Sequence, residues 1–511
     1  MAACTCKALL HLSGAQQPPR ATVVQTHDLF FLRLDSRTLL FGAADRIISR
    51  PPNLVELQRV DHFGFHNNQT FEMRYAVAEQ FWDRKSGPIF FYAGNEFFIE
   101  NFIESTGLIW EWAPEMKALI IFAEHRFYGK SMPFGEQSLK GLPYLGYLTA
   151  EQAMADYADL LIHIKGTLPG AANCPVVAFG GSYGGMLAAW MRMKYPHLVT
   201  AALSSSAPLL MFPGLTPCSA FNQAITRAFD QEGPLCSRTI RKSWAIIESK
   251  FSSEESVKAL RKKFKLCEEL RSTDYLKLRD YLHDVYMVLA MLNYADASSL
   301  LTPLPANPVR VSCKFLQSSF ANDEAIVEAA AKTVNLYFNG TGTLPCNDID
   351  IFYRHQTSWR FQECTELTMP TCSDGVTDMF YPELWNSTKF AQTCERKFGV
   401  RPDFYRGVMS FGGKNLGPAS NIVFSQGDLD PWASVGIRDS PSEDLPVILI
   451  SGAAHHSDLR FSADNDSVSL RAARELEKAH ILRWLEKAAI ADAKDRIASA
   501  LHERPLLKYF F

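Results

Sequence analysis

From about residue 56 onward, short apolar runs alternate with segments of helical periodicity along the chain. The runs at 88–92, 118–122 and 175–179 are almost free of polar side chains, which is typical of strands buried on both faces. Between residues 149 and 166, apolar positions instead recur every three or four residues, which predicts an amphipathic helix. This alternation favours a parallel sheet covered by helices.

The predicted helix at 149–166 has recognisable ends. Thr149 followed by Gln152 forms a capping box, and Gly166 is suited to end the helix. The strand at 175–179 then leads directly into a glycine-rich turn, and a further helix follows through Met191. The order strand, sharp turn, helix is therefore predicted around residue 182.

The pattern changes after Pro208, where charged, helix-like sequence begins. Strand-like runs return only at 421–425 and 446–450, and a last amphipathic helix is predicted over 467–487. We therefore predict an atypical N-terminal segment at 1–55, an α/β sheet domain formed by 56–208 and 346–490, a helical cap insertion at 209–345, and a C-terminal tail at 491–511.

Size and charge narrow the class of protein. A chain of 511 residues is too long for one compact core, so more than one structural unit is expected. The net charge of −3 gives no electrostatic reason to expect nucleic acid or an anionic membrane as a partner. No apolar run reaches the roughly 18 to 20 residues that a membrane span needs. We expect neither nucleic acid nor a membrane to be bound.

The cysteines and glycosylation sequons indicate the secretory route. Eight of the 11 cysteines lie in one region and form no CxxC pair, which favours disulfides over buried free thiols or a metal site: Cys218, Cys236, Cys267, Cys313, Cys346, Cys364, Cys372 and Cys394. Sequons predict glycosylation at Asn68, Asn339, Asn386 and Asn465. The N-terminus shows no clear signal peptide, because its short apolar patch is broken by His11 and Ser13.

A candidate nucleophile lies in the turn Gly-Gly-Ser-Tyr-Gly at 180–184. In an α/β-hydrolase fold, such a turn lifts the serine hydroxyl out of the backbone, and the N–H of the next residue faces the developing oxyanion. Ser182 is thus the expected nucleophile and Tyr183 an expected oxyanion donor. The alternative is a glycine-rich turn whose serine only caps the following helix.

An acid and a histidine should follow the nucleophile in that order, each after a later strand. The strand at 421–425 is followed by Asp428 and Asp430, and the strand at 446–450 by His455 and His456. Position along the chain leaves two choices at each place. The alternative is that the aspartates only form turns and the histidines lie at the surface.

Four longer motifs resemble the serine peptidase family of lysosomal Pro-Xaa carboxypeptidase and dipeptidyl peptidase II. They lie at 122–131 (Phe-Ala-Glu-His-Arg-Phe-Tyr-Gly-Lys-Ser), 180–190, 429–432 (Leu-Asp-Pro-Trp) and 452–456 (Gly-Ala-Ala-His-His), within a similarity over about residues 56–490. The resemblance implies an α/β-hydrolase fold with an inserted helical, disulfide-bonded cap domain, Asp430 as the acid and His455 as the base. It also implies four disulfides: Cys218–Cys372, Cys236–Cys313, Cys267–Cys346 and Cys364–Cys394.

The second oxyanion donor is expected in the loop at Gly94 and Asn95. Here the chain departs from the family, because Phe97 and Phe98 stand where relatives usually have Gly-Asp. Smaller departures are Gln426, where Asn is usual, and 433–435, where a Ser-Gly-Gly run is usual. None of these departures removes a member of the expected triad.

A proline side chain requires a compact apolar pocket. Met186 and Trp432 flank members of the expected triad, and the resemblance suggests that Met369 completes the pocket. For Met186 and Met369, simple core packing is the alternative.

The leading hypothesis is a serine exopeptidase that cleaves peptide substrates containing proline, most simply as a Pro-Xaa carboxypeptidase. The alternatives are a dipeptidyl peptidase II-like enzyme, an esterase or lipase, and an inactive hydrolase-like binding module. No HExxH motif or phosphate-binding loop occurs, so we expect no metal and no cofactor. The expected location is the lysosome or the cell exterior, and a homodimer is left open.

Overall fold

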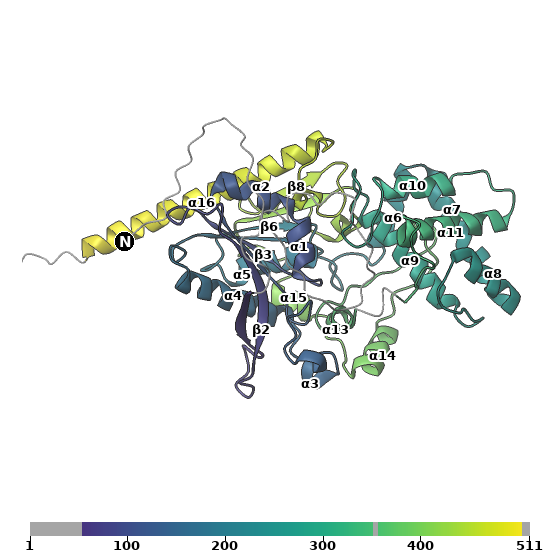
Figure 1. The fold of residues 1–511 in the computed structure, drawn as a ribbon, viewed down its shortest axis with the longest axis horizontal. Coiled ribbons are helices and arrows are strands. Elements are labelled where there is room, and N and C mark those ends of the chain that lie inside the picture. The colour runs from purple at the N-terminus through teal and green to yellow at the C-terminus, as the bar shows by residue number, and fades with distance from the viewer. Residues whose placement is uncertain (1–53, 351–355, 503–511) are drawn as a thin grey trace, which may run out of the picture.

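The computed structural model describes residues 54–350 and 356–502. Its centre is an eight-stranded sheet in the order β1-β2-β4-β3-β5-β6-β7-β8 (Figure 1). The first three strands in this order pair antiparallel, and the others pair parallel. The strands are β1 (Leu54–Arg59), β2 (Thr70–Ala78), β3 (Ile89–Ala93), β4 (Leu119–Ala123), β5 (Val176–Gly181), β6 (Ala201–Ser205), β7 (Ile422–Gly427) and β8 (Val447–Ile450). The five strands predicted from apolar runs are confirmed as β3, β4, β5, β7 and β8.

Helices cover both faces of the sheet, as expected for an α/β-hydrolase fold. Alternate residues of one strand enter different cores, so that Ile89 and Phe91 face one side while Phe90 and Tyr92 face the other. Helices α4 (Ala150–Thr167) and α5 (Tyr183–Lys194) pack on the first side. Helices α1 (Ile99–Ser105), α2 (Gly107–Met116) and α16 (Val468–His502) pack on the second.

The ends of two helices test the sequence predictions directly. Helix α4 begins after Thr149, whose hydroxyl accepts the Gln152 N–H at 3.1 Å, so the predicted helix start is confirmed. The reciprocal bond of a capping box is not made, because the Gln152 side chain bonds to Asp61 and to the backbone of His62 instead. Helix α16 extends to His502, and Figure 1 shows it running well beyond the sheet. The tail expected at 491–511 is therefore helical over its first part. An alanine-rich stretch at 488–500 explains this, because alanine favours helix without an apolar stripe.

The insertion between β6 and β7 forms a separate helical unit, seen in teal and green at one end of Figure 1. Six helices build the cap: α6 (Ala220–Gln231), α7 (Pro234–Ser249), α8 (Glu254–Phe264), α9 (Tyr275–Met291), α10 (Pro308–Leu316) and α11 (Asp323–Asn339). Their hydrophobic core also includes Ile349, Met379 and Phe380. The cap core thus continues past the expected boundary at residue 345.

In its described part, the segment between the cap helices and β7 adds no strand to the sheet. It contributes the short helices α13 (Thr357–Thr365), α14 (Ser387–Phe398) and α15 (Arg406–Phe411). A further short helix, α3 (Leu142–Leu145), precedes α4. The strands of the sheet resume at Ile422, whereas Leu367, Phe411 and Leu416 already pack in the core of the sheet domain. The boundary expected at position 346 stays a prediction.

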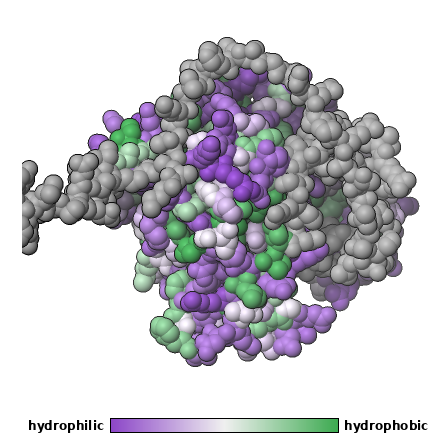
Figure 2. Space-filling view, turned by 60° about the vertical axis from the view of Figure 1, so that its left-hand side comes forward, coloured by the Kyte–Doolittle hydropathy of each residue, from purple (hydrophilic) through white to green (hydrophobic). Residues whose placement is uncertain are grey.

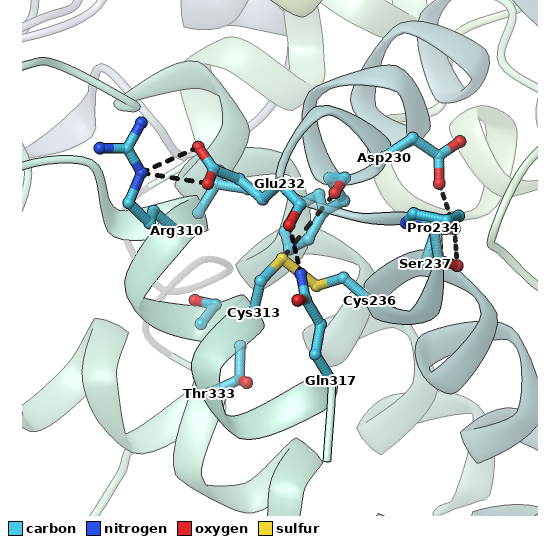
Figure 3. Close-up of a disulfide and its surroundings, with 12 residues drawn as sticks. Asp230, Glu232, Pro234, Cys236, Ser237, Arg310, Cys313, Gln317 and Thr333 are labelled. Carbon is cyan, nitrogen blue, oxygen red and sulfur yellow. Dashed lines mark hydrogen bonds and ion pairs between the residues drawn. A yellow bond between two sulfur atoms is a disulfide. The ribbon is translucent and has the colours of Figure 1, made fainter. Parts of the chain in front are cut away.

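Four disulfides cross-link the insertion. They join Cys218 to Cys372, Cys236 to Cys313, Cys267 to Cys346 and Cys364 to Cys394. These are the same four pairs that the family resemblance implies. Figure 3 shows the second of them between α7 and α10, beside the ion pair of Arg310 with Glu232. Each link reduces the conformational freedom of the unfolded chain and so stabilises the insertion.

The predicted glycosylation sites differ in accessibility. Asn68, Asn386 and Asn465 are exposed, and they stay predictions. Asn339 is only 7% exposed, and its side-chain amide makes hydrogen bonds of 2.7 and 2.8 Å to the backbone of Leu344. Asn339 is therefore the least accessible of the four sites, and its glycosylation also stays a prediction.

The described surface carries both polar and apolar residues. Over the described part of the face in Figure 2, hydrophilic and hydrophobic residues are interspersed. Among the helices of the described ranges, none combines the length and apolar character needed to cross a membrane.

Candidate active site

The turn between β5 and α5 has the geometry expected of a nucleophile elbow. Ser182 adopts φ 59° and ψ −128°, a conformation that costs energy in a residue with a side chain. Its backbone N–H donates to Ser205 O at 2.9 Å, which ties the turn to β6. Ser182 is half-buried, whereas both chain neighbours are fully buried. The strained turn thus raises the hydroxyl out of the core.

Glycines are required here by close backbone approach. A Cβ on Gly180 would lie 2.0 Å from Gly184 O, and one on Gly185 would lie 2.7 Å from Ser205 O. Neither contact can relax without moving α5 away from the sheet. The glycine-rich motif therefore allows the helix to begin immediately after the serine.

The structure distinguishes the two candidate acids. Asp430 Oδ2 lies 2.9 Å from His455 Nδ1, and the two residues are 2% and 3% exposed. A carboxylate can only accept, so Nδ1 carries the proton and Nε2 is left as the base. Asp428 is exposed and instead accepts the Gly452 N–H at 2.7 Å. Of the two aspartates, Asp430 is the one that contacts a histidine.

The second histidine has a different position. The His456 ring packs against the elbow, where a Cβ on Gly181 would lie 2.8 Å from its Cδ2. Its backbone N–H donates to Ser206 Oγ at 2.8 Å. Burial holds the pKa of His456 well below its ordinary value, and the neighbouring His455 lowers it further. His456 is therefore a neutral packing partner of the elbow.

Sheet topology brings the three expected triad residues to one edge. Strands β5, β6, β7 and β8 are consecutive parallel neighbours, so their carboxyl ends lie along the same edge. Ser182 follows β5, Asp430 follows β7 and His455 follows β8. In open α/β sheets this edge is where ligands bind.

The cap contacts His455 directly, which the sequence did not indicate. The His455 N–H donates to Met291 O, at the end of α9, at 3.2 Å. The Tyr294 hydroxyl donates to His455 O at 3.0 Å. The Trp432 indole N–H lies 3.2 Å from Met291 Sδ. Cap residues thus bind both backbone polar groups of the expected base.

Removing the Tyr294 hydroxyl should therefore weaken catalysis without unfolding the cap. We expect Tyr294→Phe to lower kcat about fivefold, since one neutral hydrogen bond is worth roughly 1 kcal/mol. The measurement is kcat on a proline peptide. Tyr286→Phe is the matched control, because the buried Tyr286 hydroxyl has no hydrogen-bond partner among the residues that the structure describes. Equal activity of the two variants would contradict a role for this contact.

The expected oxyanion loop lies beside the elbow. A Cβ on Gly184 would lie 2.9 Å from Asn95 Oδ1, so the Asn95 side chain borders the start of α5. Gly94 O accepts the Tyr157 hydroxyl at 2.6 Å. Phe97 and Phe98, which stand where relatives usually have Gly-Asp, are 40% and 38% exposed, so their rings lie at the surface. The oxyanion roles of Gly94, Asn95 and Tyr183 stay predictions.

The three expected pocket residues do not share one environment. Trp432 is half-buried, with its ring centroid 4.5 Å from Phe221 and 6.1 Å from His455. Met369 is half-buried and packs against both the cap core and the sheet core. Met186 is fully buried in the sheet core, so it offers no surface to a substrate in this structure. Trp432 and Met369 are the better candidates.

Within 54–350 and 356–502, no group of three or more His, Cys, Asp or Glu side chains is arranged to bind a metal ion.

Comparison with known proteins identifies the family. The model described as "Serine carboxypeptidase S28" matches residues 58–477. A lysosomal Pro-X carboxypeptidase of Homo sapiens is 43% identical over 431 residues, covering 84% of this chain and 87% of that protein. A thymus-specific serine protease of Mus musculus is 29% identical over 455 residues, covering 84% and 86%.

Among solved structures, a proline iminopeptidase of Mycobacterium smegmatis covers 86% of this chain and 100% of its own, with 8% identity and a TM-score of 0.31. The S28 model, in contrast, spans most of the present chain, including the residues at the sheet edge. The chain belongs to the serine carboxypeptidase S28 family.

Proposed function

We propose that the protein is a proline-directed serine carboxypeptidase that acts through Ser182, Asp430 and His455. The observation that carries the proposal is the 2.9 Å contact of Asp430 with His455, at the sheet edge where the strained Ser182 turn also lies. A carboxylate that orients an imidazole next to a raised serine is the arrangement used for acyl transfer.

The reaction follows from these roles. Ser182 Oγ attacks the carbonyl carbon of the proline residue, and its proton passes to His455 Nε2. The C–N bond then breaks as His455 returns the proton to the leaving amine. Water attacks the resulting ester in the same way, which releases the acid and restores the serine. Asp430 keeps Nδ1 protonated and stabilises the transient imidazolium.

The oxyanion formed in each step needs donors already in place. We assign this role to the Tyr183 N–H and to the loop at Gly94 and Asn95, which borders the elbow. Preorganised backbone donors act strongly in a site from which water is excluded.

Substrate choice is assigned to the junction of cap and sheet domain. Trp432 and Met369 supply apolar surface there, and a proline ring has no N–H to satisfy. The cap would restrict the cleft to chain ends, which favours an exopeptidase acting on peptides that contain proline. The related Pro-X carboxypeptidases are named as lysosomal. Together with the four disulfides, this supports a lysosomal or secreted protein.

Two proline peptides test the assignment, one blocked at its N-terminus and the other at its C-terminus. A carboxypeptidase cleaves the N-terminally blocked peptide and releases its last residue, which mass spectrometry identifies. Cleavage of only the C-terminally blocked peptide would replace this proposal with dipeptidyl peptidase activity. Cleavage of neither, with rapid turnover of a simple ester, would favour an esterase.

A further inference from the structure

The motif at 122–131 has no role in the triad, yet part of it surrounds the residue after the nucleophile. The Tyr183 side chain is fully buried, and its hydroxyl lies 3.1 Å from His125 Nε2 and 2.9 Å from Gln362 Nε2. Gln362 Oε1 accepts the Tyr128 hydroxyl at 2.5 Å. Gln362 Nε2 also donates to Glu366 Oε1 at 2.9 Å. Three segments distant in sequence thus meet at one phenol.

The partners determine the direction of every hydrogen bond. His125 Nδ1 lies 2.6 Å from the carbonyl oxygen of Arg126, which can only accept, so Nδ1 carries the proton. Nε2 of the neutral ring must then accept the Tyr183 hydroxyl proton. The phenol oxygen in turn accepts an amide hydrogen of Gln362. This arrangement satisfies both ring nitrogens of His125 and the whole hydroxyl of Tyr183.

Electrostatics keep the network in this state. Burial lowers the pKa of His125 to about 4, so the ring stays neutral in all but strongly acidic solution. If His125 were also protonated at Nε2, this nitrogen would become a donor and could no longer accept the Tyr183 hydroxyl proton. Burial, followed by the nearby Glu151, raises the pKa of Glu366 to about 8. Neither residue changes its charge between mildly acidic and neutral pH.

The network is anchored to rigid elements at both ends. Glu366 accepts the N–H of Ala150, the first residue of α4, at 2.9 and 3.0 Å. The Trp359 ring, from α13, packs against Tyr183 with a centroid distance of 5.6 Å. Tyr183 itself is the first residue of α5. Its side chain therefore links the start of α5 to α4 and α13.

We propose that Gln362 and His125 are positioning residues that orient the backbone N–H of Tyr183 toward the oxyanion. The proposal rests on the function assigned above, in which that N–H is one of the oxyanion donors. An oxyanion donor must be within a few tenths of an ångström of its position, because small misplacements cost large factors in rate. Fixing the phenol on two sides prevents α5 from tilting at its first residue.

The test is an isosteric carboxyl at position 362. In Gln362→Glu, the protonated acid can still donate its single hydrogen to Tyr183 and accept from Tyr128, although it loses the hydrogen bond to Glu366. The carboxylate can only accept. We expect kcat/KM within about threefold of wild type near pH 5 and at least ~10-fold lower near pH 8, because burial raises the pKa of the new acid into this range. Wild type has no ionisable group at position 362, and Glu366, with a pKa of about 8, is present in both proteins. The readout is therefore the ratio of variant to wild type at each pH.

A second measurement separates positioning from general destabilisation. Gln362→Met should weaken binding of a proline boronate, which forms an adduct with Ser182 and fills the oxyanion site, by the same factor as kcat/KM. Binding of the peptide product should stay unchanged. Thr365→Val is the matched control on α13, since its hydroxyl bonds only to carbonyl groups of its own helix. A parallel loss of boronate and product binding, or a pH-independent ratio in Gln362→Glu, would overturn the proposal.

The rate at which a fluorophosphonate labels Ser182 distinguishes the two levels of inference. If wild-type protein is not labelled, the proposed function fails. If wild type is labelled and both Gln362 variants react at the wild-type rate at every pH, only the positioning role fails.

Discussion

Replacing Asp430 with asparagine is expected to lower kcat by about 10⁴-fold while leaving the fold intact. The side chain keeps its size, but an amide in place of the carboxylate no longer holds His455 in the tautomer with the proton on Nδ1. His455 Nε2 then cannot take the proton of Ser182. The measurement is kcat on an N-terminally blocked proline peptide, with thermal unfolding as the check on folding.

Asp428→Asn is the control for this prediction, because Asp428 is exposed and bonds to the neighbouring loop at Gly452. We expect it to change kcat by less than about threefold. The assignment of the acid is wrong if Asp428→Asn proves the more damaging of the two.

The second large effect concerns stability. Arg126 is completely buried and bonds to Asp156 through two nitrogens, at 2.6 and 2.7 Å. It also donates to backbone carbonyls of Arg59 and Val60. Arg126→Met should lower the free energy of unfolding by about 3–5 kcal/mol, because it leaves a buried carboxylate without its main partner. Denaturant unfolding measures the loss.

Arg84→Met provides the comparison for a surface pair. Arg84 is half exposed and pairs with Glu79 at 2.8 Å. Because solvent screens an exposed ion pair, its contribution to the free energy of unfolding is at most ~1 kcal/mol. Equal destabilisation by the two arginine variants would show that the buried network at Asp156 does not contribute as described.

Each strand that was predicted from the sequence contains a run of at least three apolar residues. The apolar runs at 88–92 and 118–122 became β3 and β4 because both faces of each strand are buried. Strand β2 escaped detection because Arg74 lies in its middle, where Glu124 on the loop after β4 neutralises it at 3.2 Å. In a sequence pattern, a charged residue is interpreted as exposed, because the distant residue that pairs with it in the folded protein is not visible locally.

Strand β6 was missed for a related reason. Its residues Ala201–Ser205 are small, and two serines give the run a polar character. Ser204 donates to Gly185 O at 2.8 Å and Ser205 to Asp458 Oδ1 at 2.6 Å, so both hydroxyls are satisfied inside the protein. Small side chains are needed there because α5 packs closely against this strand. Neither condition is visible in local sequence.

By itself, the sequence determined the architecture and the chain order of the catalytic candidates. Apolar runs that end in glycine-containing turns are visible in the local sequence. They place Ser182 after one predicted strand, the two candidate aspartates after a second and the two candidate histidines after a third. Position along the chain left both Asp428 and Asp430 open, and the family resemblance implied Asp430. Only the tertiary structure shows the physical reason, because the Asp430 carboxylate contacts His455 whereas the Asp428 carboxylate contacts Gly452. The tertiary structure alone also joined His125 and Gln362 at Tyr183, because hydrogen bonds between distant segments leave no periodic signal in the sequence.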